Sequence, residues 1–388
     1  INVELDEPEG VVTARLLGLF ATGTAVYRKG LGCASAPNGD IEAVKLINLD
    51  GAPIEQYTRP SDWPMGPNNI AVDSILADEE LVGPAMRAVV VIKDGMLIGE
   101  TYGSGFDAET PLLGWSMTKT VTALLLGGAF EEQFDPEMTV LFAHWNDDIR
   151  RDVSLGALMS MSSGLQWNEG YGSVSDVTRM LYLEPDMAAF AASLPIDNEN
   201  APKRFHYSSG TTVLLSRIWQ DHLGDKALTL PHEKLFGPLG MRTATLETDA
   251  AGTYAGSSYL YASARDWARI GQLIANKGVW AGKQLANEEY LSWMVSPAAT
   301  SMAAWGRAKY GNGQIWLHGP SRGVAEGIDP DAGFDLPLDT RWLLGHDGQA
   351  IAVIPSKGLV VVRMGLTPSN LGYRPQAMVS AILAATGS

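Results

Sequence analysis

Two β-hairpins that lie far apart in the chain constrain its fold most. Residues 88–92 and 96–100 are largely apolar and flank Lys93-Asp94-Gly95, in which Asp-Gly is a strong signal for a tight turn. Residues 350–354 and 359–364 flank a second turn that contains a proline and a glycine. Because a hairpin is an antiparallel pair of strands, we expect an antiparallel sheet that is built from both ends of the sequence.

The stretch between the two hairpins is predicted to be mainly helical. Apolar residues recur at helical spacing in six segments, at about 117–128, 153–161, 174–183, 187–194, 211–223 and 263–276. Two further helices are expected, one over residues 374–385 and one near residues 12–27. The predicted fold class is therefore α+β, an antiparallel β-sheet flanked by helices, with an inserted mainly helical lobe.

The length of the chain predicts more than one lobe. A chain of 388 residues exceeds what a single hydrophobic core usually holds. We expect residues 81–115 and 241–388 to form an α/β lobe with the sheet, and residues 116–240 to form the mainly helical lobe. Residues 1–80 are expected to be an N-terminal extension packed on the core. The active site is expected between the lobes.

The charge and the metal-binding residue types exclude several classes of function. A net charge of −16 disfavours nucleic-acid binding, because phosphates would be repelled. Cys33 is the only cysteine, so no intrachain disulfide and no cysteine-based metal site can form. The six histidines show no close ligand spacing such as His-Glu-x-x-His. The sequence therefore predicts no metal and no cofactor.

Targeting signals are weak in this sequence. No apolar run reaches the ~18 residues of a membrane span, so none is expected. The apolar run 15–27 is followed by Arg28 and Lys29, where a signal peptide would have small residues. Because the sequence starts at Ile1 without a methionine, we expect that a leader or tag was removed. A periplasmic or secreted location is favoured over a cytoplasmic one, and the oligomeric state stays open.

A hydroxyl and an amine lie three residues apart in Ser116-Met117-Thr118-Lys119. On a helix, residues i and i+3 share a face, so Oγ of Ser116 and Nζ of Lys119 can approach hydrogen-bond distance. A helix N-terminus and burial both lower the pKa of a lysine, and a neutral lysine can activate a serine. Taken alone, the motif is also explained by a helix-capping serine beside a solvated lysine.

Two further loops could complete such a site. Tyr207 lies on a loop before a helix, so its hydroxyl could face a cleft and shuttle a proton. The segment Gly345-His346-Asp347-Gly348-Gln349 lies at the edge of the second hairpin, where glycines let the backbone approach a ligand closely. Taken singly, a packed tyrosine and an ordinary loop are the simpler interpretations.

Together, the motifs Ser-x-x-Lys, Tyr-x-Ser and His-x-Gly resemble the serine β-lactamase and penicillin-binding-protein superfamily, in its class C-like branch of esterases and amidases. Within it, the sequence is most similar to the 6-aminohexanoate-dimer hydrolases, and the resemblance covers about residues 86–366. It implies that Ser116 is the acylated nucleophile, Lys119 its activating partner and Tyr207 a proton shuttle. It also implies an oxyanion hole from the backbone N–H groups of Ser116 and Gln349. Lys119 and Tyr207 both remain candidates for the acylation base.

Two departures from that superfamily bear on the substrate. Where penicillin-handling members carry Lys-Thr-Gly or Lys-Ser-Gly, this chain has His346-Asp347-Gly348, so a titratable imidazole replaces a fixed cation. Where many members carry Tyr-x-Asn, Ser209 has a shorter reach to the substrate. Tyr171 ends a segment that looks like the mobile loop of the 6-aminohexanoate-dimer hydrolases, although it could be an ordinary exposed tyrosine. The resemblance implies that Tyr171, Ser209, His346 and Gly348 contact the substrate.

The expected function is hydrolysis of ester or small linear amide bonds through a covalent acyl-enzyme, of the carboxylesterase or 6-aminohexanoate-oligomer amidase type, on a small-molecule substrate. The alternatives are β-lactamase or D-amino-acid peptidase activity, and a non-catalytic sensor or binding module that is acylated without turnover. An α/β-hydrolase is disfavoured, because Gly114-Trp115-Ser116-Met117-Thr118 lacks the second glycine of Gly-x-Ser-x-Gly.

Overall fold

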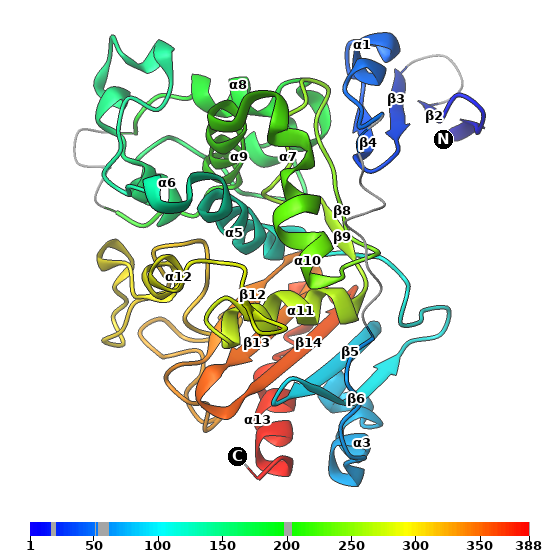
Figure 1. Cartoon of the computed structure of the whole chain (residues 1–388), viewed down its shortest axis with the longest axis vertical. Helices are drawn as coiled ribbons and strands as arrows, with labels where there is room; N and C mark the ends of the chain where they lie inside the picture. Colours follow the sequence, from blue (N-terminus) through cyan, green and yellow to red (C-terminus); the bar gives the residue numbers. More distant parts are fainter. Residues whose placement is uncertain (17–20, 51, 53–61, 198–203, 388) are drawn as a thin grey trace.

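A five-stranded antiparallel sheet joins two segments that lie far apart in the sequence (Figure 1). The computed structural model describes residues 1–16, 21–50, 52, 62–197 and 204–387. The strands follow the order β12 (Arg341–Leu344), β13 (Ala350–Ile354), β14 (Leu359–Gly365), β5 (Met86–Lys93) and β6 (Met96–Tyr102). Strands β14 and β5 are neighbours, with Val361 opposite Val91. Both predicted hairpins are therefore confirmed, and they form a single sheet.

Helices cover both faces of this sheet. One face is covered by α3 (Ile70–Leu76), α4 (Glu79–Val82) and α13 (Gln376–Ala385), and the other by α11 (Ala264–Ala275). Val89 and Val91 belong to the first layer, whereas Val90 and Ile92 belong to the second, and all four side chains are fully buried. Because successive side chains of a strand point to opposite faces, a strand that is covered on both faces is continuously apolar.

A mainly helical half lies above the sheet in Figure 1. It contains α5 (Thr118–Phe130), α6 (Leu155–Met159), α7 (Asp176–Leu183), α8 (Met187–Ser193), α9 (Ser209–Leu223) and α10 (Gly237–Leu239). Helix α5 packs against α9, which in turn packs against α6 and α8, around buried side chains such as Leu124, Val213 and Trp219. The helices that apolar spacing predicted are confirmed here, with ends shifted by a few residues.

The remaining elements are short. Two small antiparallel sheets contain β7 (Leu112–Leu113), β9 (Leu260–Ala262) and β8 (Thr245–Leu246), and β10 (Val279–Trp280) with β11 (Lys283–Gln284). Helix α12 spans Glu288–Val295, a π-helical turn spans Pro231–Phe236, and 3₁₀ turns lie at Glu131–Gln133, Ala143–Trp145, Ile149–Asp152, Gly224–Thr229, Ala299–Ser301, Pro355–Lys357 and Ser369–Leu371. The α+β fold class is confirmed, and the lobe boundaries stay a prediction. None of the helices in the described part of the chain is both long and apolar enough to cross a membrane.

In its described residues, the N-terminal segment contains a separate four-stranded antiparallel sheet and helix α1 (Figure 1). It contains β1 (Asn2–Asp6), β2 (Val11–Leu16), β3 (Ala21–Arg28), β4 (Gly32–Ser35) and α1 (Ile41–Leu46). The helix that we expected near residues 12–27 is wrong, because β2 and β3 pair here as strands, and residues 17–20 lie outside the described part. Two threonines and a glycine at positions 22–24 are poor helix formers, and Val and Thr favour strands.

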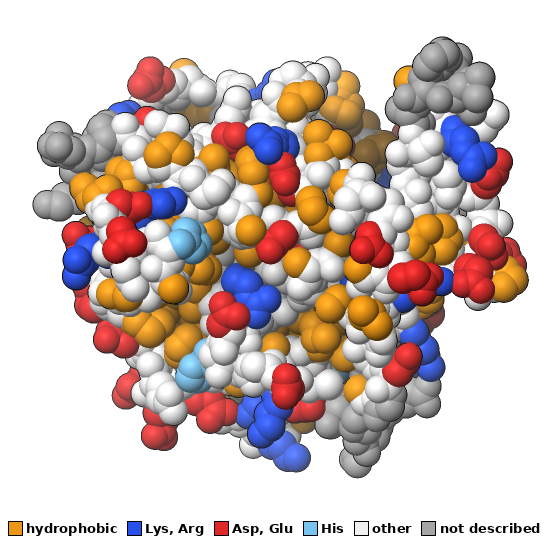
Figure 2. Space-filling view, turned by 90° about the horizontal axis from the view of Figure 1, so that it is seen from above, with side chains coloured by type: hydrophobic (Ala, Val, Ile, Leu, Met, Phe, Trp, Pro, Cys, Tyr) orange, Lys and Arg blue, Asp and Glu red, His pale blue; other side chains and the backbone are white. Residues whose placement is uncertain are grey.

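The sheet of β1–β4 is attached to the rest of the molecule by polar contacts. The Arg28 guanidinium donates to the Thr248 carbonyl oxygen at 2.8 Å, and the Cys33 backbone N–H donates to Glu247 Oε1 at 2.8 Å. On the face of the molecule seen in Figure 2, acidic side chains are scattered among apolar ones, in keeping with the net charge of −16.

Candidate active site

Ser116 and Lys119 lie where a 3₁₀ turn runs directly into helix α5. The turn spans Trp115–Met117, and Lys119 lies in the first turn of α5. Trp115 has a positive φ of 48°, a conformation that costs an ordinary residue on the order of 1–3 kcal/mol. The chain thus makes a strained turn directly before Ser116, and this turn places the serine at the helix N-terminus.

The Lys119 ammonium is buried and contacts Ser116 as the motif predicted. Lys119 is 1% exposed, and its Nζ lies 3.2 Å from Ser116 Oγ. It also donates to Ser209 Oγ at 2.9 Å and to the Ser257 carbonyl oxygen at 3.0 Å. Burial lowers the pKa of Lys119 to about 8, although the charge of Glu169 acts in the opposite direction. A lysine with this pKa is partly neutral near pH 8 and can accept a proton.

Glu169 is a member of this cluster that sequence reasoning missed. Its carboxylate accepts from the Ser209 hydroxyl at 2.6 Å, from the Ser209 backbone N–H at 2.9 Å and from Trp167 Nε1 at 2.5 Å. Ser209 therefore links Glu169 to Lys119. Glu169 was present in the loop segment that ends at Tyr171, but no local pattern marked it, because its partner Ser209 comes from a distant helix.

Tyr207 lies beside the Ser116 and Lys119 pair. Its ring stacks on Trp316 with 5.3 Å between centroids and an interplanar angle of 26°, and Lys119 Nζ lies 5.0 Å from the ring centroid. Burial raises the pKa of Tyr207 well above its usual value, with Tyr310 and Glu169 adding to the shift, while a hydrogen bond with Ser116 lowers it. The phenol is therefore held protonated and in contact with the Ser116 hydroxyl.

The turn that contains Gln349 lies directly against the turn before Ser116. Gly345 passes so close to it that a Cβ there would lie 2.3 Å from the Gly114 carbonyl oxygen. Gln349 is 5% exposed, and both polar atoms of its side-chain amide bond to Gly365. Nε2 donates to the Gly365 carbonyl oxygen at 2.5 Å, and Oε1 accepts from the Gly365 N–H at 2.9 Å. Within the described residues, no acceptor takes a hydrogen bond from the backbone N–H of Ser116 or Gln349.

Gly348 and Asp347 give this turn its shape. Both have positive φ, 83° and 54°, respectively. A Cβ on Gly348 would lie 2.9 Å from Nη1 of the buried Arg363, which donates to the Gly348 carbonyl oxygen at 3.1 Å. Glycine at 348 is therefore required by the backbone and by its neighbour, and the prediction that Gly348 itself contacts the substrate stays a prediction.

Three aromatic side chains, of Trp115, Tyr171 and His346, meet beside Ser116. The ring centroid of Tyr171 lies 4.5 Å from that of His346 and 6.2 Å from that of Trp115, and the centroids of Trp115 and His346 are 5.4 Å apart. Burial raises the pKa of Tyr171 above its usual value, with Glu169 and Tyr182 adding to the shift. The His346 side chain is 38% exposed, with Nε2 lying 3.4 Å from Asp347 Oδ1. The structure thus brings Tyr171 and His346 together.

These residues enclose a cavity of about 240 Å³, here called the Ser116 cavity. It is lined by Ser116, Glu169, Tyr171, Tyr207, Trp316, His318, Ser321, Leu344, Gly345 and His346. His318 is a second residue that sequence reasoning missed. Its Nδ1 donates to the Gly319 carbonyl oxygen at 2.6 Å, and no described residue is a hydrogen-bond partner of its buried Nε2. Because burial lowers the pKa of His318, the ring is neutral and Nε2 is a free acceptor.

The arrangement supplies the parts of a nucleophilic acyl-transfer site. A serine hydroxyl contacts a buried lysine and a tyrosine, and two free backbone N–H groups lie in adjoining turns. Among the residues that the structure describes, no group of three or more His, Cys, Asp or Glu side chains is placed to hold a metal ion.

Comparisons with known proteins find a similar hydrolase sequence and similar solved structures. A 6-aminohexanoate-dimer hydrolase of Paenarthrobacter ureafaciens is 23% identical over 286 residues, which cover 68% of this chain and 72% of that protein. The solved structure of a family VIII carboxylesterase has a TM-score of 0.61 and 14% identity, covering 84% of this chain and 99% of that one. A penicillin-binding-protein homologue from Caulobacter crescentus has a TM-score of 0.61 and 15% identity, covering 83% and 98%. These structural likenesses show the fold.

The family assignment rests on a separate match to a family model. The model of the family described as Beta-lactamase matches residues 79–381, which include both hairpins and the Ser116 cavity. Since this match covers well over half of the sequence, the chain belongs to the Beta-lactamase family.

Proposed function

We propose that the protein hydrolyses ester or small linear amide bonds through a covalent acyl-enzyme on Ser116. The chain is a serine hydrolase of the Beta-lactamase family. The observation that carries the proposal is the buried Lys119 amine, 3.2 Å from Ser116 Oγ, with a pKa lowered to about 8. An amine in this state can take the serine proton as the bond to the substrate forms.

In the acylation step, Ser116 Oγ attacks the substrate carbonyl carbon while its proton passes to Lys119. The negative charge that develops on the carbonyl oxygen is stabilised by the N–H groups of Ser116 and Gln349. Tyr207, which is protonated at rest, then gives its proton to the leaving oxygen or nitrogen and recovers one from Lys119. The bond to the leaving group breaks, and the acyl group remains on Ser116.

Lys119 suits the role of acylation base better than Tyr207. The lowered pKa of Lys119 makes the neutral amine accessible near pH 8, whereas the raised pKa of Tyr207 keeps the phenol protonated. Tyr207 suits the second half of the reaction as a donor and acceptor for the water. In deacylation, that water attacks the acyl carbon and gives its proton to Tyr207 while Tyr207 passes its own proton to Ser116 Oγ, so the bond between Ser116 and the acyl group breaks and the serine hydroxyl is restored.

The lining of the Ser116 cavity supports esters and linear amides over β-lactams. Position 346 carries an imidazole whose ring centroid lies 4.5 Å from that of Tyr171, where penicillin-handling members carry lysine. The His318 Nε2 acceptor also suits an uncharged N–H or O–H donor better than a carboxylate. The names of two similar proteins, a 6-aminohexanoate-dimer hydrolase and a family VIII carboxylesterase, fit these two bond types.

Three substrates test the proposal, namely a short p-nitrophenyl ester, 6-aminohexanoate dimer and a chromogenic cephalosporin. We expect turnover of the ester or of the dimer, with the cephalosporin slowest. Ser116→Ala should abolish turnover, and Ser193→Ala, which removes a hydroxyl bonded to the Phe190 carbonyl oxygen, is the matched control. Wild-type ester turnover in Ser116→Ala would overturn the assignment.

Mass spectrometry separates an enzyme from a module that is acylated without turnover. An enzyme treated with the ester should show a transient acyl adduct on Ser116 and a burst of p-nitrophenol followed by steady release. A single stoichiometric burst with a stable adduct would instead support the non-catalytic alternative.

A further inference from the structure

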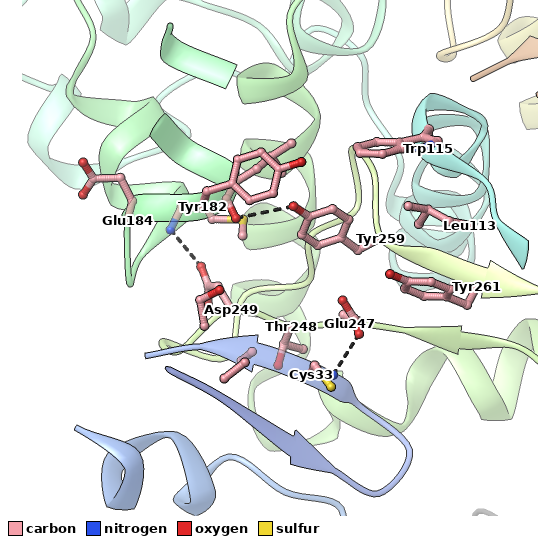
Figure 3. Close-up of a pocket in the computed structure, with 15 residues that line it drawn as sticks. Cys33, Leu113, Trp115, Tyr182, Glu184, Glu247, Thr248, Asp249, Tyr259 and Tyr261 are labelled. Atoms are coloured by element: carbon pink, nitrogen blue, oxygen red, sulfur yellow. Dashed lines mark hydrogen bonds between the residues drawn. The ribbon is translucent and has the colours of Figure 1, made fainter. Parts of the chain in front are cut away.

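A second cavity lies between the N-terminal sheet and the helical half (Figure 3). Its volume is about 260 Å³, and we call it the N-terminal cavity. It is lined by Ala25, Cys33, Ala34, Ser35, Leu113, Trp115, Leu181, Tyr182, Glu184, Met187, Glu247, Thr248, Asp249, Tyr259 and Tyr261. Trp115 is common to its wall and to the aromatic group beside Ser116, but Ser116 itself is not part of the lining.

Aromatic rings form much of this wall. Tyr182, Tyr259, Tyr261 and Trp115 line the cavity, and the ring centroids of Trp115 and Tyr259 are 6.4 Å apart at an interplanar angle of 61°. Leu113, Leu181 and Met187 add apolar surface. The faces of such rings carry negative partial charge, so an enclosure of this kind attracts cations and alkyl groups together.

Glu247 places a carboxylate in the same cavity. Figure 3 shows it between the Cys33 backbone and the rings of Tyr259 and Tyr261. Its Oε1 accepts from the Cys33 N–H at 2.8 Å, and no donor among the described residues is bonded to Oε2. Burial raises the pKa of Glu247 to about 7, although the Cys33 N–H and the Arg28 charge act in the opposite direction. A cation at this position would stabilise the ionised form.

Thr248 adds a second polar group with unused hydrogen-bonding capacity. The residue is 2% exposed, and its Oγ1 has no hydrogen-bond partner among the described residues. Figure 3 shows Thr248 next to Glu247 on the same wall. A buried hydroxyl without a partner destabilises the folded protein, and a ligand that donates to it would relieve that cost.

The other charged groups around the cavity are already paired. The Asp249 carboxylate accepts from the backbone N–H groups of Met187, Ala251 and Thr253 at 2.8–3.0 Å. Glu184 lies 2.6 Å from Arg179. Arg28 donates to the carbonyl oxygens of Thr248 and Asp249. Among the described residues, Glu247 is therefore the lining carboxylate that has neither a cation partner nor both oxygens occupied.

We propose that the N-terminal cavity binds a small organic cation with a primary ammonium group, which donates to the Glu247 carboxylate and the Thr248 hydroxyl. The aromatic rings and the apolar side chains enclose its alkyl body. This site goes beyond the proposed hydrolysis and does not depend on it, because none of the groups that hold the cation takes part in acyl transfer.

Isothermal titration calorimetry of the full chain in an amine-free buffer at pH 8 tests the site. The probe is n-butylammonium, with 1-butanol as the neutral molecule of equal size and butyrate as the anion. We expect saturable binding of n-butylammonium, with a Kd on the order of 1 mM and at least about tenfold weaker binding of 1-butanol. Butyrate should not bind, because it would meet the charge of Glu247.

Variants separate recognition of the charge from simple filling of the cavity. Glu247→Gln keeps an acceptor for the Cys33 N–H but removes the charge, so it should weaken n-butylammonium binding by about tenfold or more. Thr248→Val should weaken it less, by about threefold. Glu184→Gln is the matched control, because Glu184 already pairs with Arg179, and it should leave the affinity unchanged.

Folding and cavity occupancy need their own checks. Ester turnover and thermal melting should stay near wild type in Glu247→Gln, and Ser35→Phe should abolish n-butylammonium binding by filling the cavity from the N-terminal sheet. Equal affinity for n-butylammonium and 1-butanol would overturn the proposal. Unchanged n-butylammonium binding in a folded Glu247→Gln variant, or no saturable binding in the wild type, would overturn it too.

Discussion

Lys119 and Glu169 share the hydroxyl of Ser209. The Ser209 hydroxyl accepts from Lys119 Nζ at 2.9 Å and donates to Glu169 Oε1 at 2.6 Å. Two opposing effects therefore set the pKa of Lys119. Burial lowers it to about 8, and the negative charge of Glu169 holds it above the value that burial alone would give.

The first prediction is a rise of activity with pH through the pKa of Lys119. The ammonium form cannot accept the Ser116 proton, so kcat/KM for a neutral ester should increase as the pH rises through about 8. Well below that pH it should fall about tenfold per pH unit, because the neutral fraction of the amine falls by that factor. A profile that is flat between pH 6 and pH 9 would contradict Lys119 as the base.

The second prediction concerns the charge of Glu169. Glu169→Gln removes the anion that stabilises the Lys119 ammonium, so the midpoint of the pH profile should move to lower pH. The plateau can fall as well, because the same carboxylate fixes Ser209 and Trp167, so the midpoint is the quantity to compare. Glu184→Gln is the control for the loss of one carboxylate. A midpoint that stays or rises in Glu169→Gln would be evidence against this coupling.

The third prediction concerns the Tyr207 hydroxyl. Tyr207→Phe keeps the ring that stacks on Trp316 and removes the group that contacts Ser116. We expect kcat/KM to fall about 10²- to 10⁴-fold, as is usual when a general acid–base is removed, with little change in melting temperature. Tyr27→Phe, at a position that is 57% exposed, serves as the control. A fall in kcat/KM of less than threefold in Tyr207→Phe would show that the Tyr207 hydroxyl does not transfer a proton in the reaction.

The sequence predicted the parts of the fold that depend on local pattern. In the first hairpin, Asp94 and Gly95 have φ values of 51° and 77°, as expected for an Asp-Gly turn between strands. The apolar run of β5 was informative because both of its faces are buried. The segment that forms β2 and β3 was misread, because its apolar residues were counted as a helical run while its Thr-Gly-Thr stretch favours strands.

In the candidate site, too, only the residues that are related by a local pattern could be predicted. Ser116 and Lys119 are three residues apart, so helix geometry brings them together. Glu169 and His318 could not be predicted, because a half-buried carboxylate and an imidazole with one unpartnered nitrogen leave no local pattern. Their contacts depend on how distant elements pack, with Glu169 bonded to Ser209 forty residues away. The unpartnered atoms Glu247 Oε2 and Thr248 Oγ1 could not be predicted from the sequence for the same reason.

The last prediction tests the turn that positions the Gln349 N–H. Gly348→Ala puts a Cβ at positive φ and 2.9 Å from Arg363 Nη1. Arg363 cannot easily move away, because it is 1% exposed and donates to the carbonyl oxygens of Val82 and Pro84 and to Thr367. The turn must therefore shift, and loss of one oxyanion donor should lower kcat by about 10²- to 10³-fold.

Gly372→Ala is the matched control for that substitution. Gly372 also has a positive φ, 68°, but an added Cβ there meets nothing within 4 Å. Urea unfolding should show a cost of about 1–2 kcal/mol for Gly372→Ala, from backbone strain alone, and a larger cost for Gly348→Ala. Ester turnover should be normal in Gly372→Ala. If Gly348→Ala kept the kcat of the control, the turn would not hold an oxyanion donor, because the substitution necessarily displaces the backbone that carries Gln349.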